Sequence, residues 1–333
     1  MPSRRYRFGP GIGVEIAGES RILEFFEAEY GPAADTQERG LPEVRVSLAT
    51  AALAPGEAPR VSGRHKTVGW EVDLPDPAAH PLRASIRVMG RPRPFVLSLV
   101  QGFFIEPLIS IAMARSQCVL LPAAGIVGGA GVTVLIGPSR SGKSSVSALA
   151  LARGRQVLGD DQVIVSSGGC QVFWRRLRLY HDLPEVVPAA YGALAAPARR
   201  SIAILRLLAS ASRGYIRPPL RLAPTALSGS PVPPGALPIA RAILLGRSPS
   251  PDLAASEADL EALVGQCLGL LGEQRAHLAA HPRWGEALGG GIESEGAYIR
   301  AAFARACIER LTVPQSWPPD RAVAAIAAHL GLV

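Results

Sequence analysis

Residues 132–161 read VTVLIGPSRSGKSSVSALALARGRQVLGDD, and this stretch decides the fold. Its first five residues, 132–136, are apolar, as in a buried strand. Residues 143–153 have the composition of a helix, and Gly154 is suited to end it. Residues 156–161 then have the character of a second strand. A strand, a glycine-rich loop, a helix and another strand predict an α/β fold.

The loop that joins the first strand to the helix runs from Gly137 to Ser144 and matches the pattern G-x-x-x-x-G-K-[ST]. Glycines at the two fixed positions let the backbone wrap a phosphate closely, so that successive amide N–H groups point at the anion. The positive end of the following helix faces the same anion. Lys143 is placed to reach the β- and γ-phosphates, and the Ser144 hydroxyl to ligate Mg²⁺. The pattern predicts an ATP site formed by Gly137, Pro138, Ser139, Arg140, Ser141, Gly142, Lys143, Ser144 and Ser145.

The use of lysine gives a separate argument for this site. The chain has 35 basic residues, of which only Lys66 and Lys143 are lysines. Where any basic side chain suffices, this sequence uses arginine. A lysine at the loop position therefore indicates a site that needs a compact ammonium group and cannot take a planar guanidinium.

Asp160 and Asp161 end the predicted second strand, sixteen and seventeen residues after Ser144. A crossover through the helix is expected to bring that strand end beside the loop. Carboxylates there can hold Mg²⁺, and one of them can accept the proton of an attacking hydroxyl. We therefore predict Lys143, Asp160 and Asp161 as catalytic residues, and Ser144, Asp160 and Asp161 as Mg²⁺ ligands. The alternative interpretation is a pair of solvated aspartates in a turn.

The run AAGIVGGAGVTVLIGPSRSGKSSVSALALARGRQVLGDDQVIV, residues 123–165, resembles the catalytic core of the HPr kinase/phosphorylase family. That family joins a hairpin, a P-loop, a helix ending in a small-residue turn, and a strand closing with Asp-Asp. The resemblance implies a P-loop kinase core of the HPr kinase/PEP carboxykinase-like type with a β-rich N-terminal region. It also implies Mg·ATP-dependent phosphorylation of a serine in a peptide or protein, such as a lasso-peptide precursor. It carries Lys143, Ser144, Asp160 and Asp161 into functional roles.

The chain differs from the usual family pattern at a few positions. Ala123 and Ala124 stand where a His is usual, Ser145 stands where a Glu is common, and no R-G-x-G signature follows. These differences concern phosphorylase activity and HPr as the substrate, and they leave the predicted nucleotide binding unchanged. Relatives of this type are often oligomeric, which leaves a homo-oligomer open.

The rest of the chain divides into a β-rich leader and a larger kinase region. Residues 1–94 contain short alternating runs separated by Pro and Gly, which predicts strands. The kinase domain is predicted to occupy residues 95–333, with a helix over 95–115 and a core at 118–166. Residues 184–238 are rich in Pro, Ala and Arg and predict a mobile basic segment. Strands at 239–245 and 308–313 and helices at 257–271, 273–281, 298–307 and 321–330 are predicted within the C-terminal region 239–333.

The formal net charge of +8 is concentrated in one part of the chain. Residues 167–235 carry nine arginines against Asp182 and Glu185. Such a region attracts phosphates or acidic peptides, or forms a solvated arginine-rich loop. Two groups of arginines are candidates for contact with a phosphate or an acidic peptide. The first group, Arg175, Arg176 and Arg178, fits an exposed strand slightly better, and the second group consists of Arg213, Arg217 and Arg221.

Nothing in the sequence points to a membrane or to an oxidising compartment. Residues 1–13, MPSRRYRFGPGIG, are not followed by the apolar segment of a signal peptide. The four cysteines form no CxxC unit. Residues 118–136 are uncharged, but two buried strands joined by a GGAG turn explain them better than a membrane span. We expect a cytoplasmic protein.

The leading hypothesis is an ATP-dependent kinase that phosphorylates a serine of a peptide or protein. One alternative is a small-molecule kinase with the same core, and another is a non-catalytic module that senses ATP. A nucleic-acid ATPase is a third alternative. Because the basic segment is rich in proline and poor in stacking aromatic residues, we do not expect nucleic acid as a partner.

Overall fold

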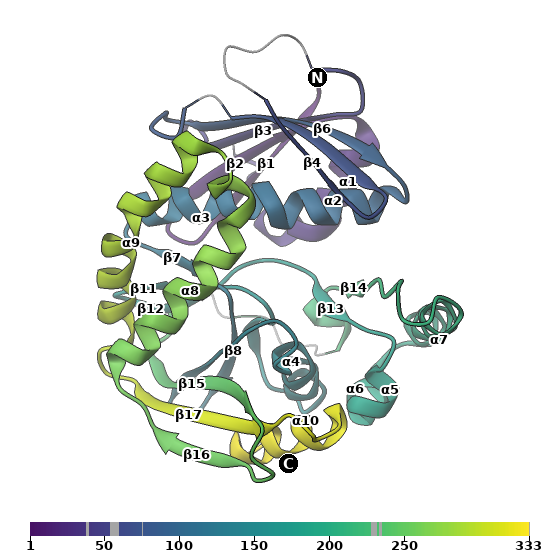
Figure 1. Cartoon of the computed structure of the whole chain (residues 1–333), viewed down its shortest axis with the longest axis vertical. Coiled ribbons are helices and arrows are strands. Elements are labelled where there is room, and N and C mark those ends of the chain that lie inside the picture. Colours follow the sequence, from purple (N-terminus) through teal and green to yellow (C-terminus); the bar gives the residue numbers. More distant parts are fainter. Residues whose placement is uncertain (38–39, 54–59, 75, 228–231, 233–234, 333) are drawn as a thin grey trace. The chain divides into compact units, whose positions relative to one another are not determined.

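The computed structural model of the 333-residue chain describes residues 1–37, 40–53, 60–74, 76–227, 232 and 235–332. The chain divides into two compact units (Figure 1). The first comprises Met1–Leu120 with Leu271–Ala297, and the second comprises Leu121–Leu270 with Tyr298–Val333. Each combines helices with a mixed β-sheet, so the predicted α/β class is confirmed.

The first unit is built on a six-stranded sheet with the order β1-β2-β3-β6-β5-β4. Strands β2, β3 and β6 are parallel neighbours, and the remaining pairs are antiparallel. Buried residues alternate along β5, as expected where only one sheet face covers the core. The prediction that residues 1–94 contain strands is confirmed by this sheet. The six strands are β1 (Ser3–Phe8), β2 (Ile12–Ala17), β3 (Val44–Ala49), β4 (Val61–His65), β5 (Val68–Asp73) and β6 (Leu82–Gly90).

Helices pack on the sheet of the first unit. Because two of them follow residue 94, the unit continues past the domain boundary that the sequence predicted there. α2 contacts β6, and α3 contacts β2 and β3. Their apolar residues, including Val96, Ile105 and Ile109, are buried. The helix predicted over 95–115 therefore belongs to the first unit. The helical segments are α1 (Ser20–Tyr30), η1 (Gly31–Ala33), α2 (Arg93–Val100), the π-helical η2 (Gln101–Ile105) and α3 (Glu106–Arg115).

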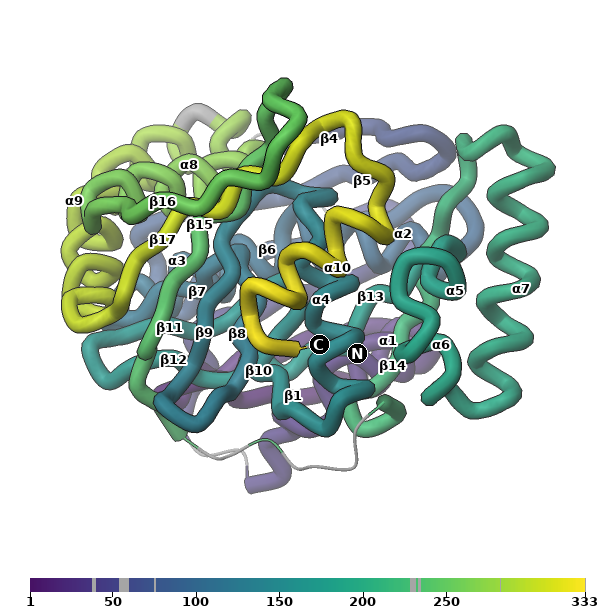
Figure 2. Tube along the Cα trace, turned by 90° about the horizontal axis from the view of Figure 1, so that it is seen from below, coloured from purple at the N-terminus to yellow at the C-terminus, as the bar shows by residue number. Residues whose placement is uncertain are grey.

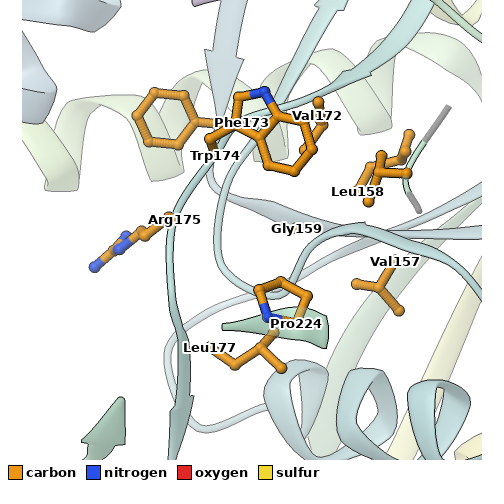
Figure 3. Close-up of a pocket in the computed structure, with 10 residues that line it drawn as sticks. Val157, Leu158, Gly159, Val172, Phe173, Trp174, Arg175, Leu177 and Pro224 are labelled. Carbon is orange, nitrogen blue, oxygen red and sulfur yellow. The ribbon is translucent and has the colours of Figure 1, made fainter. Parts of the chain in front are cut away.

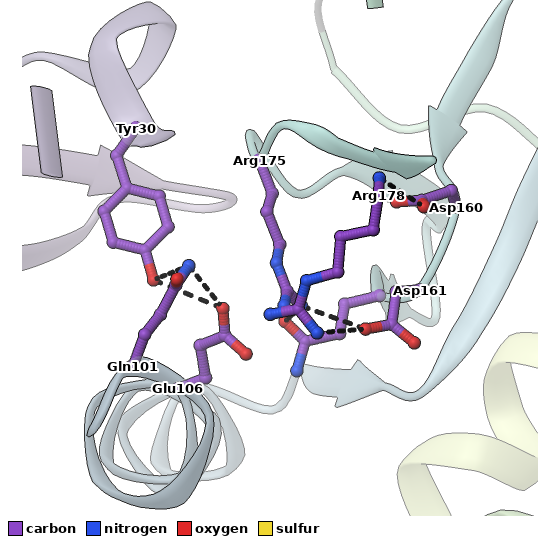
Figure 4. A network of polar contacts seen from close by, with 8 residues as sticks. Tyr30, Gln101, Glu106, Asp160, Asp161, Arg175 and Arg178 are labelled. Atoms are coloured by element: carbon purple, nitrogen blue, oxygen red, sulfur yellow. Dashed lines mark hydrogen bonds and ion pairs between the residues drawn. The ribbon is translucent and has the colours of Figure 1, made fainter. Parts of the chain in front are cut away.

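Two polar side chains in this apolar helical run bond to each other and to Tyr30. Gln101 Nε2 donates to Glu106 Oε1 at 2.8 Å and to Tyr30 Oη at 3.0 Å. Tyr30 Oη donates to Glu106 Oε1 at 3.3 Å (Figure 4). By length and hydropathy Arg93–Arg115 meets the requirement for a membrane span, but 67% of its most apolar window is buried. This burial is typical of a core helix.

Two long helices pass from one unit to the other along the chain. They are α8 (Leu260–Ala279) and α9 (Pro282–Phe303). The prediction of separate helices at 257–271 and 273–281 is wrong, because α8 continues through Gly272, and Glu257 ends a strand. The helix predicted at 298–307 ends at Phe303. Within the first unit, Arg275 of α8 bonds to Glu295 of α9 at 2.5 and 2.8 Å and to Ser110 of α3 at 2.6 Å.

The second unit contains a six-stranded sheet with the order β10-β8-β9-β15-β17-β16. Its centre is parallel, because β15 pairs with both β9 and β17 in the same direction. The outer pairs, β10 with β8, β8 with β9 and β16 with β17, are antiparallel. The six strands are β8 (Ala123–Gly128), β9 (Gly131–Ile136), β10 (Val157–Gly159), β15 (Ile239–Ser248), β16 (Ala254–Glu257) and β17 (Cys307–Pro314). β7 (Val119–Leu121) belongs to a separate three-stranded sheet with β11 (Val163–Ser166) and β12 (Gly169–Val172).

Two helices pack against this sheet and against each other (Figure 2). α4 (Lys143–Ala152) contacts β8 and β10, and α10 (Pro319–His329) contacts β17 and α4. Their core residues include Val146, Leu151 and Ile326, which are buried with Ile243 of β15. The predicted hairpin within 118–136, the strand at 239–245 and the helix near 321–330 are confirmed as β8–β9, β15 and α10. The predicted strand at 308–313 is confirmed as β17.

The stretch 184–238 contains more regular structure than predicted. The sixteen-residue helix α7 (Ala196–Ala211) was not predicted at all. Prolines occupy the first turns of three helices here, a position that lacks a hydrogen-bonded N–H and therefore suits proline. Residues 228–231 and 233–234 lie outside the described residues. The other elements are α5 (Leu183–Val186), α6 (Pro188–Ala193), β13 (Leu177–Leu179), β14 (Leu220–Leu222) and η3 (Pro224–Ala226).

The Arg275–Glu295 pair gives a test of the first unit's packing. Glu295→Ala leaves the Arg275 guanidinium buried without its carboxylate, so the free energy of unfolding should fall by about 3–5 kcal/mol. Urea unfolding followed by circular dichroism measures it. The matched control is Glu261→Ala, which removes a pair that Arg300 makes at 2.7 Å on the exposed surface. Equal losses for the two variants would contradict a structural role for the buried pair.

Candidate functional site

The loop 137–142 connects the buried end of β9 to the first residue of α4. Its first glycine is required by close packing against β15. A Cβ atom on Gly137 would lie 2.9 Å from both the Cβ and the carbonyl oxygen of Leu245. Ser141 is buried in the loop, whereas Pro138, Ser139 and Arg140 are exposed. Ser144 and Ser145 follow in the first turn of α4 and are half-buried.

Lys143 begins α4, and its side chain folds back across the loop. Only 7% of its surface is exposed. Its Nζ donates to the carbonyl oxygens of Gly137 at 2.6 Å and Pro138 at 2.9 Å, and it lies 3.4 Å from Ser141 Oγ. Burial lowers the pKa of Lys143, while the charges of Asp161 and Asp160 oppose that change. The ammonium group is thus held at the loop and lies within range of both carboxylates.

The two aspartates follow β10 in a sharp turn. Gly159 permits this turn, because a Cβ atom there would lie 2.0 Å from the carbonyl oxygen of Gln162. In the sheet β8 lies between β10 and β9, the strand that leads into the loop. Both β9 and β10 are antiparallel to β8, so their carboxyl ends share one edge of the sheet. α4 crosses β8 and contacts β10, which brings its start near Asp160.

Asp160 is buried and connects the end of β10 to the start of α4. Its carboxylate accepts a hydrogen bond from the Ser144 hydroxyl. It also accepts one from the backbone N–H of Arg178 at 3.2 Å (Figure 4). Burial, followed by the charge of Asp161, raises the pKa of Asp160 to about 7, while Arg175 and Ser144 act in the opposite direction. Asp160 therefore titrates near neutral pH and touches a predicted Mg²⁺ ligand.

Asp161 occupies a different environment. Its side chain is 40% exposed and lies 3.2 Å from Nη1 of Arg175 and 3.5 Å from Nη1 of Arg178 (Figure 4). Arg175 Nη1 also lies 3.4 Å from Gln162 Oε1. Arg175 is buried, so the interpretation of these arginines as decoration of an exposed strand is wrong for that residue. Neighbouring carboxylates in unlike environments are suited to different chemical tasks.

Arg178 and Arg221, near the two carboxylates, were not predicted to lie together. In the antiparallel pair of β13 and β14, Arg178 stands directly opposite Arg221. Partial burial, and then the charges of Asp161 and Asp160, raise the pKa of Tyr180. Like charges placed opposite each other destabilise a strand pair unless an anion lies between them. The sequence named Arg221 as a candidate, but it gave no sign that Arg221 would pair with Arg178. Arg213 and Arg217 are exposed in the turn after α7.

The donor set of Ser144 and Asp160 is chemically suited to Mg²⁺. A hydroxyl and a carboxylate provide hard oxygen ligands, and Mg²⁺ commonly takes only one or two carboxylates, with waters and phosphate oxygens completing its coordination. Across the described part of the chain no group of three or more His, Cys, Asp or Glu side chains forms a metal-binding cluster. A site that relied on protein ligands alone is therefore not indicated.

A small, mostly apolar pocket is lined by residues of β10 and of the segment 172–177, including Arg175 (Figure 3). Its empty volume of about 260 Å³ includes its open mouth. The room that it offers to the centre of a water-sized sphere is only about 10 Å³, about enough for one water, so we do not assign a nucleotide base to it. The lining residues include Val157, Gly159, Phe173, Trp174, Leu177 and Pro224.

Comparison with known proteins adds no assignment to this geometry. A scan against protein-family models gives no match, and a search of curated proteins finds no significant relative. The functional interpretation therefore depends on the residues of the site and on the resemblance of residues 123–165.

The buried Asp160 predicts how stability depends on pH. Since its folded pKa is raised above the usual value for an unfolded chain, the folded state holds an extra proton between about pH 4 and pH 7. Stability contributed by that proton is present at low pH and is lost as the pH rises through about 7. Asp160→Asn removes this dependence, so the variant should gain stability over the natural chain as the pH rises.

The measurement is urea unfolding from pH 4.5 to 8 without nucleotide or Mg²⁺. Between the unfolded and the folded pKa of Asp160, the stability difference between the two chains should change by on the order of 1.4 kcal/mol per pH unit. Asp252→Asn, at an exposed position, is the matched control and should follow the natural chain. A difference between Asp160→Asn and the natural chain that stays constant over this range would contradict a raised pKa.

Proposed function

We propose that this protein is an ATP-dependent kinase that transfers the γ-phosphoryl group of Mg·ATP to a serine hydroxyl of a peptide or protein. The single observation that carries the proposal is the Ser144–Asp160 hydrogen bond. It joins the end of the glycine-rich loop to the acidic pair sixteen residues later. Lys143, Ser144, Asp160 and Asp161 then form one group, as a P-loop kinase core of the HPr kinase type requires.

In this proposal the loop and the start of α4 bind the triphosphate of the ATP substrate. Backbone N–H groups at the helix start have no partner within the helix and favour an anion. Lys143 exchanges its bonds to the Gly137 and Pro138 carbonyls for phosphate oxygens. Ser144 and Asp160 would hold Mg²⁺, which when bound supplies positive charge to the phosphates.

Asp161 is assigned to the acceptor side. It is the more exposed of the two carboxylates, whereas Asp160 bonds to Ser144. In the reaction Asp161 accepts the proton of the acceptor serine as its oxygen attacks the γ-phosphorus. The bond from phosphorus to the β,γ-bridging oxygen breaks, and ADP keeps that electron pair. Arg175 and Arg178, which contact Asp161, are placed to offset negative charge on the transferring group.

The choice of a serine in a peptide or protein is supported by the resemblance of residues 123–165 and by the positive charge of residues 167–235. A small-molecule kinase would use the same nucleotide site with a different acceptor. A non-catalytic ATP sensor would bind nucleotide without transfer. Incubation of the protein with γ-labelled ATP against a serine-peptide array and against a metabolite mixture separates the three functions.

The first test uses the two lysines of the chain. Lys143→Ala should lower phosphoryl transfer to the peptide array by at least about 100-fold, because it removes the ammonium from the phosphates. Lys143→Arg should also fail, since a guanidinium does not fit the compact position. Lys66→Ala is the matched control and should retain transfer within about twofold, as Lys66 is exposed in another part of the chain. Full transfer by Lys143→Ala would refute the kinase proposal.

The second test separates the roles of the two aspartates. Asp160→Asn should reduce Mg²⁺-dependent ADP affinity by about 10–100-fold, because it weakens a metal ligand. Asp161→Asn should bind Mg·ADP within about threefold of the natural chain but slow transfer by at least about 100-fold. Calorimetry measures ADP binding with and without Mg²⁺, and Asp252→Asn is the control. If Asp161→Asn lost Mg·ADP affinity and Asp160→Asn lost only transfer, the roles of the two aspartates would be exchanged. If both variants kept full binding and transfer, neither role would stand.

A further inference from the structure

Large apolar side chains gather on the surface at the end of α7. In the described part of the chain nine such side chains are exposed, and five of them lie between residues 204 and 216. We call these five the α7 patch. They are Ile204 (58% exposed), Leu207 (70%), Leu208 (45%), Tyr215 (64%) and Ile216 (50%). Soluble proteins rarely gather apolar groups in this way without a binding function.

The geometry of α7 fixes the patch in place. Ile204, Leu207 and Leu208 have the i, i+3, i+4 spacing of one helix face. The opposite face is already packed, because Ile202 and Ala209 are buried. α7 therefore presents apolar residues both toward the protein and toward solvent. Figure 2 shows it at the edge of its unit, outside α5 and α6.

The turn after α7 holds the other two members of the patch. Gly214 N–H donates to the Ala209 carbonyl at 2.7 Å, and Tyr215 N–H donates to the Ser212 carbonyl at 3.0 Å. Ile216 N–H donates to Ser212 Oγ at 3.0 Å. Since these bonds fix the backbone of Tyr215 and Ile216, the patch is a formed surface.

The stretch of chain that carries the patch contains basic residues and no acidic ones. Residues 186–251 contain no Asp or Glu and eight arginines. Arg200 precedes Ile204 by four residues and so lies on the same helix face. Arg206 forms an ion pair with Glu185. The surface that α7 offers is therefore both apolar and positive, and it matches a partner that is apolar and negative.

The patch is connected to the candidate site through one strand pair. α7 contacts β14, whose Arg221 stands opposite Arg178 of β13. Arg178 in turn contacts both aspartates, through its backbone N–H to Asp160 and its guanidinium to Asp161. The helix that carries the patch therefore contacts the strand that pairs with β13, which holds residues assigned to the acceptor.

We propose that the α7 patch is the docking surface for an acidic amphipathic segment of the peptide or protein that this kinase phosphorylates, an inference that rests on the proposed function. The segment places leucine-like side chains on Ile204, Leu207 and Leu208, and its carboxylates meet Arg200 and its neighbours. A second copy of the chain is a poorer match, because it brings the same acid-free, arginine-rich stretch.

The test uses a fluorescein-labelled, 18-residue helical peptide with leucine at every third or fourth position and glutamate elsewhere. Fluorescence anisotropy is measured with the full chain in the absence of ATP. We expect the peptide to bind at least tenfold tighter than versions with lysine for glutamate or with serine for leucine. The double variant Leu207→Gln/Leu208→Gln should lose at least fivefold in affinity, and Arg200→Glu should lose a similar factor.

The matched control is Leu41→Gln, which replaces a leucine that is also 70% exposed, on the other unit. It should bind the peptide as the natural chain does. Equal binding of the acidic and basic peptides, or unchanged binding by the double variant, would overturn the proposal. So would tight binding to phosphatidylserine vesicles without peptide binding, or self-association that the double variant abolishes.

The same variants separate this proposal from the kinase proposal. Leu207→Gln/Leu208→Gln should bind Mg·ADP as the natural chain does, because it leaves the loop and Asp160 unchanged. Lys143→Ala should bind the peptide as the natural chain does. If Lys143→Ala keeps phosphoryl transfer but the peptide results hold, the kinase proposal fails and the docking surface stands. If the peptide results fail while transfer depends on Lys143, only the docking proposal fails.

Discussion

The buried carboxylate of Asp160 connects several elements of the second unit. Asp160 lies at the carboxyl end of β10, where a carboxylate without partners is costly. The Ser144 hydroxyl, the Arg178 backbone N–H and the nearby Arg175 offset that cost. Each partner comes from a different element, namely α4, β13 and the segment before it. The carboxylate of Asp160 thus adds polar links between β10, α4 and β13 to the apolar core that α4 and these strands share.

The sequence predicted the parts of this arrangement that depend on local pattern. The apolar run of β9, the glycine spacing of the loop, the start of α4 and the pair Asp160–Asp161 are all visible within thirty residues. It did not predict the order of the strands in the sheet. The insertion of β8 between β9 and β10 depends on hairpin pairing, which a local pattern does not encode. The site formed nevertheless, because two strands antiparallel to the same neighbour end at the same edge.

Other failures have equally specific physical causes. The prolines near α5, α6 and α7 suggested irregular structure, yet each stands in the first helical turn, where proline costs no hydrogen bond. The burial of Arg175 was not predicted because its partner Asp161 lies fourteen residues away and is reached only through the β12–β13 connection. Gly137 was explained by the approach of a phosphate, but packing against Leu245 requires a glycine there as well.

The arginines of residues 175–221 link the two proposals through one electrostatic argument. In the structure Arg175 and Arg178 contact Asp161, and Arg221 faces Arg178 across a short strand pair. A two-stranded ribbon is only marginally stable by itself, and this one is supported by α4 on β13 and by α7 on β14. Negative charge from a transferring phosphoryl group, or from the carboxylates of a peptide seated on α7, would add to the contacts of these arginines. The acceptor and the nucleotide would then favour the same arrangement of β13 and β14, so that binding of one strengthens binding of the other.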